Sequence, residues 1–114
     1  MAIKENNFDI IQGDTWDAYV TLSNDSGLVD LTGYTFEIEV RDKPGGNIIC
    51  ATATLGNGIS VSSLGTIYVN LTPAQTSKFV LPKSKYQLIS IDPLNRRKTV
   101  MQGWFQVEAG TVSL

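Results

Sequence analysis

The segment DLTGYTFEIEVRDKPGG, residues 30–46, consists of a turn, an alternating strand and a second turn. Asp30 and Gly33 occupy the first and fourth positions of a type I turn, where the Asp side chain can accept hydrogen bonds from the N–H groups of the turn. Residues 35–41 then alternate apolar and polar side chains. This alternation predicts an antiparallel strand with one face toward a core and the other toward water.

The second turn of this segment sends the chain back on itself. Pro44 presets φ for the second position of a type II turn, and Gly45 can adopt the positive φ that the third position requires. We therefore expect residues 47–55 to return antiparallel to the preceding strand. The candidate structural turn residues are Gly13, Asp30, Gly33, Pro44 and Gly45.

The rest of the chain continues as short strands separated by turn residues, at a spacing of about 8–12 residues that is typical of a sandwich or barrel. One helical signal interrupts them: Thr72 can cap a helix, Pro73 suits its first position, and Gln75 completes a capping box. Gly103 lies inside the last expected strand, where it predicts a bulge. The expected strands are residues 8–11, 16–22, 35–41, 47–55, 59–61, 66–71, 85–92 and 98–109.

These about eight strands and one short helix define the expected fold class. The connections are too short for parallel crossovers, which favours antiparallel pairing. We expect an all-β protein with an antiparallel immunoglobulin-like β-sandwich, and a small barrel is the alternative. Residues 1–114 are expected to form a single β-sandwich domain, because a chain of this length can bury one substantial core.

The composition argues against most catalytic chemistry. Histidine is absent, which removes the commonest general base and the commonest metal ligand. Cys50, the single cysteine, lies in an apolar segment, so we expect it to be buried, with a disulfide-linked dimer as the alternative. We therefore predict no enzymatic activity, no catalytic residues, no metal ligands and no cofactor.

The net charge of −2 hides an uneven distribution along the chain. Residues 1–42 hold nine of the eleven acidic residues, and residues 43–114 hold seven of the nine basic ones. The two halves either interleave and mix their charges, or they form an acidic and a basic face that steer head-to-tail association. A pI near 4.9 argues against nucleic acid as a partner.

No membrane partner is expected either. No apolar run of the sequence reaches the ~20 residues that are needed to span a bilayer. The N-terminal residues include a lysine but no apolar stretch after it, so we expect no secretory signal.

One basic cluster stands out, and it comprises Lys83, Lys85, Arg96, Arg97 and Lys98. Residues 96–98 are either a solvated hairpin tip or a patch that meets an acidic protein surface. Trp104 shares a strand face with polar residues, and an exposed Trp in such a position typically marks a protein contact. The candidate protein-interaction residues are Arg96, Arg97, Lys98 and Trp104.

Three segments together resemble small structural proteins of tailed bacteriophages. They are IIQGDTW (residues 10–16), the segment of residues 30–46, and YQLISIDPLNRRKTVMQGWFQV (residues 86–107), with LTPAQT (residues 71–76) before the last of them. Their order and spacing are similar to those of the N-terminal β-sandwich of phage baseplate upper proteins. The resemblance covers nearly the whole chain, and each motif in it is mainly turn chemistry.

The resemblance implies a non-enzymatic virion structural protein of a phage or prophage, located in the tail or baseplate. An adaptor, connector or decoration role is expected, because the chain ends at Leu114 without the long C-terminal extension of baseplate proteins. The implied partners are other tail or baseplate proteins, and homo-oligomerisation is a further option. The implied location is the virion, after synthesis in the cytoplasm of the bacterial host.

A carbohydrate-binding module is the alternative function. Exposed aromatic side chains on a sandwich face can form a platform for a host cell-surface glycan. The candidate glycan-platform residues are Tyr19, Tyr34 and Tyr68. An enzyme is the third hypothesis, and it has no set of residues to name.

Overall fold

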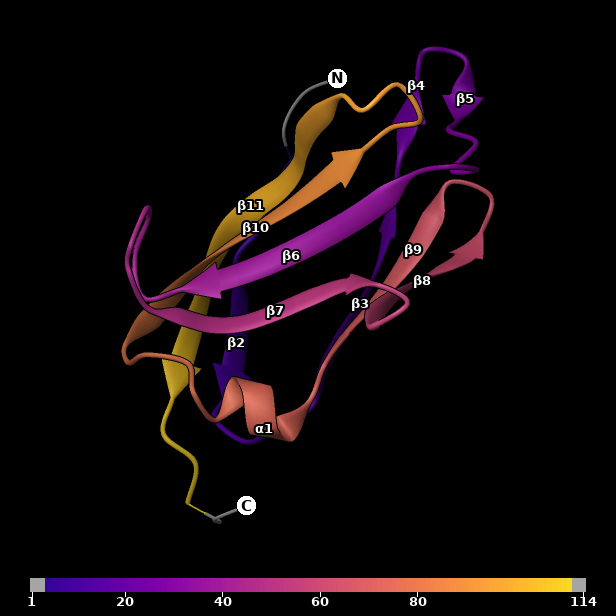
Figure 1. Cartoon of the computed structure of the whole chain (residues 1–114). Helices are drawn as coiled ribbons and strands as arrows, with labels where there is room; N and C mark the ends of the chain where they lie inside the picture. The colour runs from indigo at the N-terminus through magenta and orange to yellow at the C-terminus, as the bar shows by residue number, and fades with distance from the viewer. Residues whose placement is uncertain (1–3, 112–114) are drawn as a thin grey trace.

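The computed structural model describes residues 4–111, and the elements of this part of the chain are eleven strands and one short helix (Figure 1). The helix α1 is too short to cross a membrane, and no other helix is present among the described residues. The elements are β1 (Lys4–Glu5), β2 (Phe8–Ile11), β3 (Trp16–Thr21), β4 (Ser23–Asn24), β5 (Gly27–Leu28), β6 (Thr35–Arg41), β7 (Ile49–Leu55), β8 (Gly58–Ser63), β9 (Thr66–Leu71), α1 (Pro73–Thr76), β10 (Lys83–Ile91) and β11 (Arg97–Glu108).

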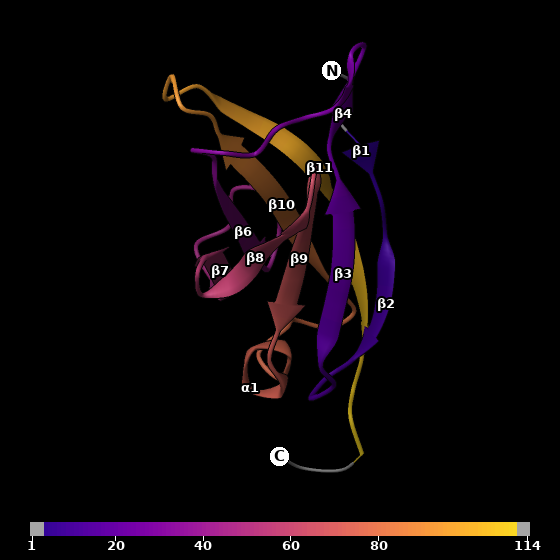
Figure 2. The same ribbon diagram turned by 90° about the vertical axis from the view of Figure 1, so that its right-hand side faces the viewer.

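The strands form two layers that pack face to face, as Figures 1 and 2 show. The large layer places β1 and β2 beside β11, followed by β10, β6 and β7, and the small layer contains β8, β9 and β3. The two layers join at a corner, where Thr54 and Leu55 of β7 pair with Gly58 and Ile59 of β8. This arrangement confirms the predicted immunoglobulin-like β-sandwich, and the short hairpin of β4 and β5 lies outside the two layers.

An aromatic cluster occupies the core between the layers. The ring of Phe105 on β11 is fully buried, and its centroid lies 5.0 Å from that of Trp16 on β3 and 5.0 Å from that of Phe79. The rings of Tyr86 and Phe8 lie 5.1 Å and 5.8 Å from it. Because Trp16 belongs to the small layer and Phe105 to the large one, this cluster joins the two sheets.

Residues 30–46 form the predicted strand between two turns, but the first turn lies one residue later than expected: the N–H of Tyr34 donates to the carbonyl of Leu31, which puts Gly33 at the third position of the turn and not the fourth. β6 spans the alternating residues and pairs antiparallel with β7, and its apolar side chains are buried. The Asp30 carboxylate accepts a hydrogen bond from the backbone N–H of Thr32 at 3.0 Å. Gly33 and Gly45 both adopt positive φ, at 80° and 67°. These turns fix where β6 begins and where the hairpin reverses.

The pairing at the N-terminus differs from the expectation of a wholly antiparallel sheet. β1 and β2 both pair parallel with β11. β1 and β2 come from the opposite end of the chain to β11, so no short connection joins these parallel strands. The first two strands therefore extend the large layer. The antiparallel expectation also fails at the corner between the layers, where two residues of β7 pair parallel with β8.

This parallel pairing also explains Gly103, where a bulge was expected. The register shift in the β10–β11 ladder lies instead between Leu88 and Ile89. A side chain at position 103 would overlap the backbone carbonyl oxygen of Asn6, because the N-terminal segment lies against β11 at this point. The glycine therefore allows the N-terminal segment to approach the last strand closely.

The helix α1 has the predicted cap and also covers an edge of the large layer. Thr72 accepts a hydrogen bond from the N–H of Gln75, and the Gln75 side chain accepts one from the N–H of Thr72. The same Gln75 side chain donates to the backbone carbonyl of Thr52 on β7 at 2.8 Å. One side chain therefore caps the helix and satisfies a polar group on the outer edge of β7.

Replacing Gly45 by Val tests the turn that closes the β6–β7 hairpin. Nothing lies within contact of a side chain at this position, so the penalty is the backbone strain of a β-branched residue at positive φ. We expect Gly45→Val to lower the free energy of unfolding by about 1 kcal/mol or more in urea denaturation.

The matched control is Gly45→Asn, since Asn tolerates positive φ far better than Val does. It should retain most of the stability that Gly45→Val loses. Equal losses in the two variants would contradict the assignment of the penalty to φ.

Candidate functional site

The outer surface of the large layer carries charged side chains of both signs together with the aromatic side chain of Trp104. Side chains on β6, β10 and β11 alternate between the core and this surface. Cross-strand pairing therefore sets them in rows, such as Arg41, Lys85 and Trp104 on adjacent strands. We call this surface the Trp104 face, and its main residues are Glu37, Glu39, Arg41, Lys83, Lys85, Gln87, Arg97, Gln102 and Trp104.

Trp104 is the largest side chain on this face, and two lysines flank its ring. The Nζ atom of Lys83 lies 4.3 Å from the ring centroid and that of Lys85 lies 5.4 Å from it. Both distances are within the range in which a cation is attracted by an aromatic ring. The backbone N–H of Trp104 also donates a hydrogen bond to the Asn7 side chain at 2.9 Å, which anchors the strand beneath the ring.

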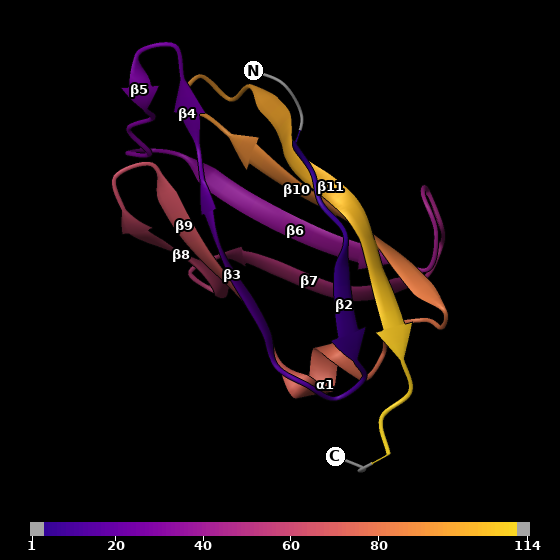
Figure 3. The ribbon, with the colours of Figure 1, turned by 180° about the vertical axis from the view of Figure 1, so that it is seen from behind.

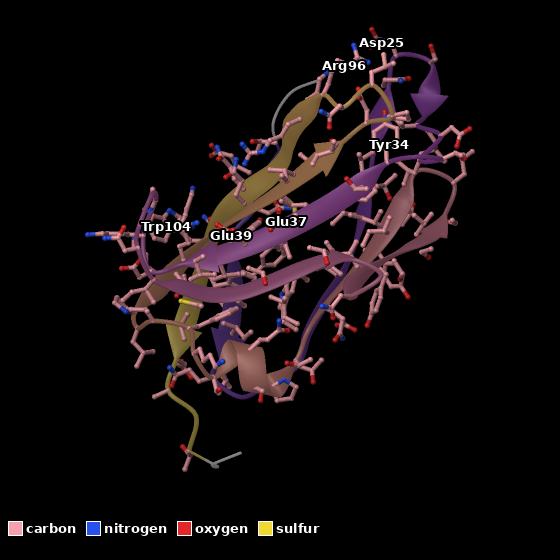
Figure 4. All side chains as sticks on the ribbon, viewed as in Figure 1. Asp25, Tyr34, Glu37, Glu39, Arg96 and Trp104 are labelled. Atoms are coloured by element: carbon pink, nitrogen blue, oxygen red, sulfur yellow. The ribbon has the colours of Figure 1, made fainter. Side chains whose placement is uncertain are left out.

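Acidic side chains lie on β6, the strand next to β10, where Figure 4 labels Glu37 and Glu39. The Nε atom of Arg41 lies 2.6 Å from Oε1 of Glu39, and both side chains are about one-third exposed. Arg97 lines a shallow hollow of the face together with Glu37 and Glu39. The Trp104 face therefore carries both signs of charge in adjacent columns.

The structure sets Arg97 apart from the two other basic residues of the predicted hairpin tip. Arg96 is bound within its own turn, since its Nε atom lies 2.7 Å from Oδ2 of Asp92. Arg97 belongs to the Trp104 face, whereas Arg96 and Lys98 both line a different hollow, next to Tyr34. Figure 4 places Arg96 and Trp104 toward opposite ends of β11.

The predicted interaction residues thus divide, and Trp104 lies with two lysines of the basic cluster. Residues 83 and 85 face positions 106 and 104 across the β10–β11 ladder. The cluster was visible in the sequence, but the pairing partner of Trp104 was not, because a shift of one residue in register would place the lysines elsewhere.

The three predicted platform tyrosines do not form one surface. Tyr19 on β3 and Tyr68 on β9 lie together on the outside of the small layer, with ring centroids 5.0 Å apart. Tyr34 stacks instead on Phe36 of the large layer, at 6.0 Å, and is half-buried. The Tyr68 hydroxyl donates a hydrogen bond to Oδ2 of Asp17 at 2.7 Å, and this bond raises the pKa of Tyr68.

Titratable groups elsewhere in the described residues serve the fold. Backbone N–H groups hold the pKa of Asp30 and of Asp92 below the ordinary value, because the turn residues Thr32 and Arg96 donate hydrogen bonds to these carboxylates. Burial raises the pKa of the Cys50 thiol and of the Tyr86 hydroxyl. Within residues 4–111, no three His, Cys, Asp or Glu side chains gather closely enough to hold a metal ion.

Comparison with known proteins bears on the fold. No family model matches the chain, and no curated protein matches it. A solved structure from a study of multimeric cell-adhesive interactions of voltage-gated sodium channel beta subunits has a TM-score of 0.53 and 14% identity, covering 91% of this chain and 92% of that one. A parallel homodimer of extracellular domains of the sodium channel beta4 subunit, described with a role in cell-cell adhesion, matches with a TM-score of 0.49 and 14% identity, covering 97% and 91%. At these identities the likeness shows an immunoglobulin-like fold and nothing finer.

The same comparison overturns the resemblance to phage baseplate upper proteins. The solved structure with the TM-score of 0.53 comes from work on sodium channel beta subunits and is not a phage protein. The expected virion role, the tail or baseplate partners and the virion location are therefore wrong, and the glycan-binding alternative is not supported. The motifs indicated the wrong function because they consist mainly of turn residues such as Gly33 and Gly45, which determine the fold. Proteins that share a fold need not share a function.

The turn carboxylates predict how stability depends on pH. Because the folded-state pKa values of Asp30 and Asp92 are lowered, their contribution is fully present above the unfolded-state pKa and is lost as the pH falls through the folded-state pKa. We expect the free energy of unfolding to fall as the pH drops below about 4, the ordinary pKa of an Asp side chain. The double variant Asp30→Asn/Asp92→Asn should lose less over that range in urea titrations, and parallel curves for the two proteins would contradict the assignment.

Proposed function

We propose that this chain is a non-enzymatic immunoglobulin-like domain that associates with further copies of itself through the Trp104 face. The observation that carries the proposal is the half-buried Trp104 ring, held between Lys83 and Lys85 on a face of mixed charge. A surface of this kind offers a large contact side chain together with charges that orient a partner.

Trp104 supplies the contact area of the proposed interface. Aromatic side chains on a surface contribute a large share of binding energy when a partner covers them and excludes water. The ammonium groups of Lys83 and Lys85 lie over the ring, so a partner that covers Trp104 also meets these two charges. Only a partner that accommodates both cations can cover the ring, which favours acidic groups opposite them.

The face itself can provide those acidic groups. Glu37 lies on β6, whereas Lys85 and Arg97 lie on the neighbouring strands β10 and β11. A second copy related by a two-fold axis would place its β6 column opposite the basic column of the first. Opposite charges then meet on both sides of the axis, and association should weaken in salt.

The structural neighbours agree with this proposal by analogy. The protein with the TM-score of 0.53 comes from work on multimeric cell-adhesive interactions, a use of the fold in which the surface acts and no reaction is catalysed. Fold alone does not define function, so the argument for this chain rests on Trp104 and its charged neighbours.

Solution mass and a Trp104→Ala variant test the proposal. We expect a concentration-dependent oligomer in light scattering that loosens when the ionic strength is raised. Trp104→Ala should weaken this association by roughly tenfold or more, because truncating a central aromatic typically removes more than 1 kcal/mol of binding energy.

The control is Leu94→Ala, which truncates a 74% exposed apolar side chain in the β10–β11 turn. It should leave the mass unchanged, since Leu94 lies outside the Trp104 face. Association that ignores both salt and Trp104→Ala would refute a role for this face.

A further inference from the structure

β3 ends the order of strands in the sheet, and it is the longest strand that does so. It pairs with β9 along its whole length of six residues and with no other described strand. At the other end of the order, β1 and β2 have two and four residues. Figure 2 shows β2 beside β3, and Figure 3 shows the two strands diverging from the turn that joins them; β2 belongs to the large layer and pairs with β11.

The direction of the free backbone groups of β3 follows from one hydrogen bond. The N–H of Leu22 donates to the carbonyl of Gly65 at 2.6 Å, so Leu22 faces β9. Backbone groups alternate in direction along a strand, and the N–H and C=O groups of Asp17, Tyr19 and Thr21 therefore point to the open edge. The side chains of these same residues are exposed on the outside of the small layer.

Asp17 is the one charged side chain of β3, and the other devices that commonly protect an edge strand are missing from it. The strand contains no Pro, Lys or Arg, and its ladder with β9 runs without a bulge from Trp16 to Thr21. The β7 edge, by contrast, is covered where Gln75 of α1 bonds the carbonyl of Thr52. An uncovered, regular edge of this length is a template for another strand.

We propose that the occupant of this edge is β3 of a second copy, paired antiparallel about a two-fold axis at Tyr19. In this register Tyr19 faces its own counterpart, and Asp17 faces Thr21 of the second copy. The backbone N–H and C=O groups of Asp17, Tyr19 and Thr21 that point to the edge then all pair with those of the second copy, which gives about six hydrogen bonds. The two small sheets become one sheet that is continuous across both molecules.

Other registers satisfy fewer groups or oppose like charges. If the register shifts by two residues, one of the three edge-directed residues of each copy no longer faces an edge-directed residue of the other β3. A shift that brings Asp17 opposite Asp17 of the second copy places two carboxylates together, which destabilises a strand pair. The sequence of β3 is thus self-complementary in the Tyr19-centred register and in no shifted one.

The side chains above this edge support the same register. Tyr19 is 68% exposed, and its ring lies 5.0 Å from that of Tyr68. Pairing at Tyr19 extends this contact into a row of tyrosines that crosses the two-fold axis. The hydrogen bond from the Tyr68 hydroxyl keeps the Asp17 carboxylate on the outside of the sheet, facing Thr21 of the second copy.

This edge contact is distinct from the Trp104 face, which lies on the other layer. Backbone hydrogen bonds carry most of the edge contact, so added salt should affect it much less than it affects the Trp104 face. Two separate two-fold contacts on one molecule would allow assemblies larger than a dimer. Either contact can exist without the other.

Paired charge variants at Thr21 test the edge. Thr21→Asp places a carboxylate opposite Asp17 of the second copy, whereas Thr21→Lys places an ammonium group there. We expect Thr21→Asp to raise the dimer Kd and Thr21→Lys to lower it, by roughly threefold to tenfold each at low salt, because the symmetry repeats the pair twice. Both variants lose the same Thr21–Thr66 hydroxyl contact, so a difference in their Kd values reports the facing charge.

Ser60 provides matched controls on the same outer surface. It lies on β8, two strands away from the edge, so Ser60→Asp and Ser60→Lys should leave the Kd unchanged. Thermal unfolding of each variant checks that the monomer remains folded. All measurements use light scattering or sedimentation of the full chain over a range of concentrations.

A cross-link provides a second, register-specific test. Facing residues of such a pair have Cα atoms about 5.5 Å apart, within the range that a disulfide spans. Tyr19→Cys should therefore form a covalent dimer on mild oxidation, and Ser60→Cys should not. The native Cys50 is buried, so we expect it not to form a disulfide under the same conditions.

The outcomes separate the edge proposal from the proposed function. A chain that stays monomeric, or Thr21 variants of opposite charge with the same Kd, would overturn the edge pairing. If Trp104→Ala abolishes association while the Thr21 variants do not change the Kd, association occurs through the Trp104 face and the edge proposal is wrong. If the Thr21 variants act in opposite directions and Trp104→Ala has no effect, the reverse holds.

Discussion

The packing of Phe105 against Trp16 of the opposite layer is the contact on which the rest of the structure depends. Its ring meets Trp16 of β3 and Tyr86 of β10, and together these side chains hold the two sheets at core distance. Since successive side chains of a strand point to opposite faces, an inward Phe105 forces Trp104 outward. The core therefore determines which aromatic residue the large layer presents to partners.

The parallel pairing of β1 and β2 with β11 has consequences at both ends of the sheet. It requires Gly103, because the carbonyl of Asn6 occupies the space of a side chain there. It also places β1 and β2 in the large layer, so no strand lies beyond β3 in the small layer. The open edge of β3 is thus a result of how the N-terminal segment is used.

The surface charges follow the strand order and not the chain order. Glu37 comes from the acidic first part of the sequence, and Lys85 comes from the basic later part, yet they lie on adjacent strands of one face. Mixing of the two parts gives a face that can complement itself. Separate acidic and basic faces would favour a head-to-tail contact instead.

The sequence by itself determined the local structure, since turn and cap chemistry acts over a few residues. The Asp30 and Gly45 turns, the bounds of β6, the Thr72 cap and the burial of Cys50 all followed from neighbours in the chain. The tertiary structure alone decided the parallel strands, the reason for Gly103, the Lys83–Trp104 contact and the free edge of β3. These features depend on register and strand order between distant segments, which core packing selects and no local pattern encodes.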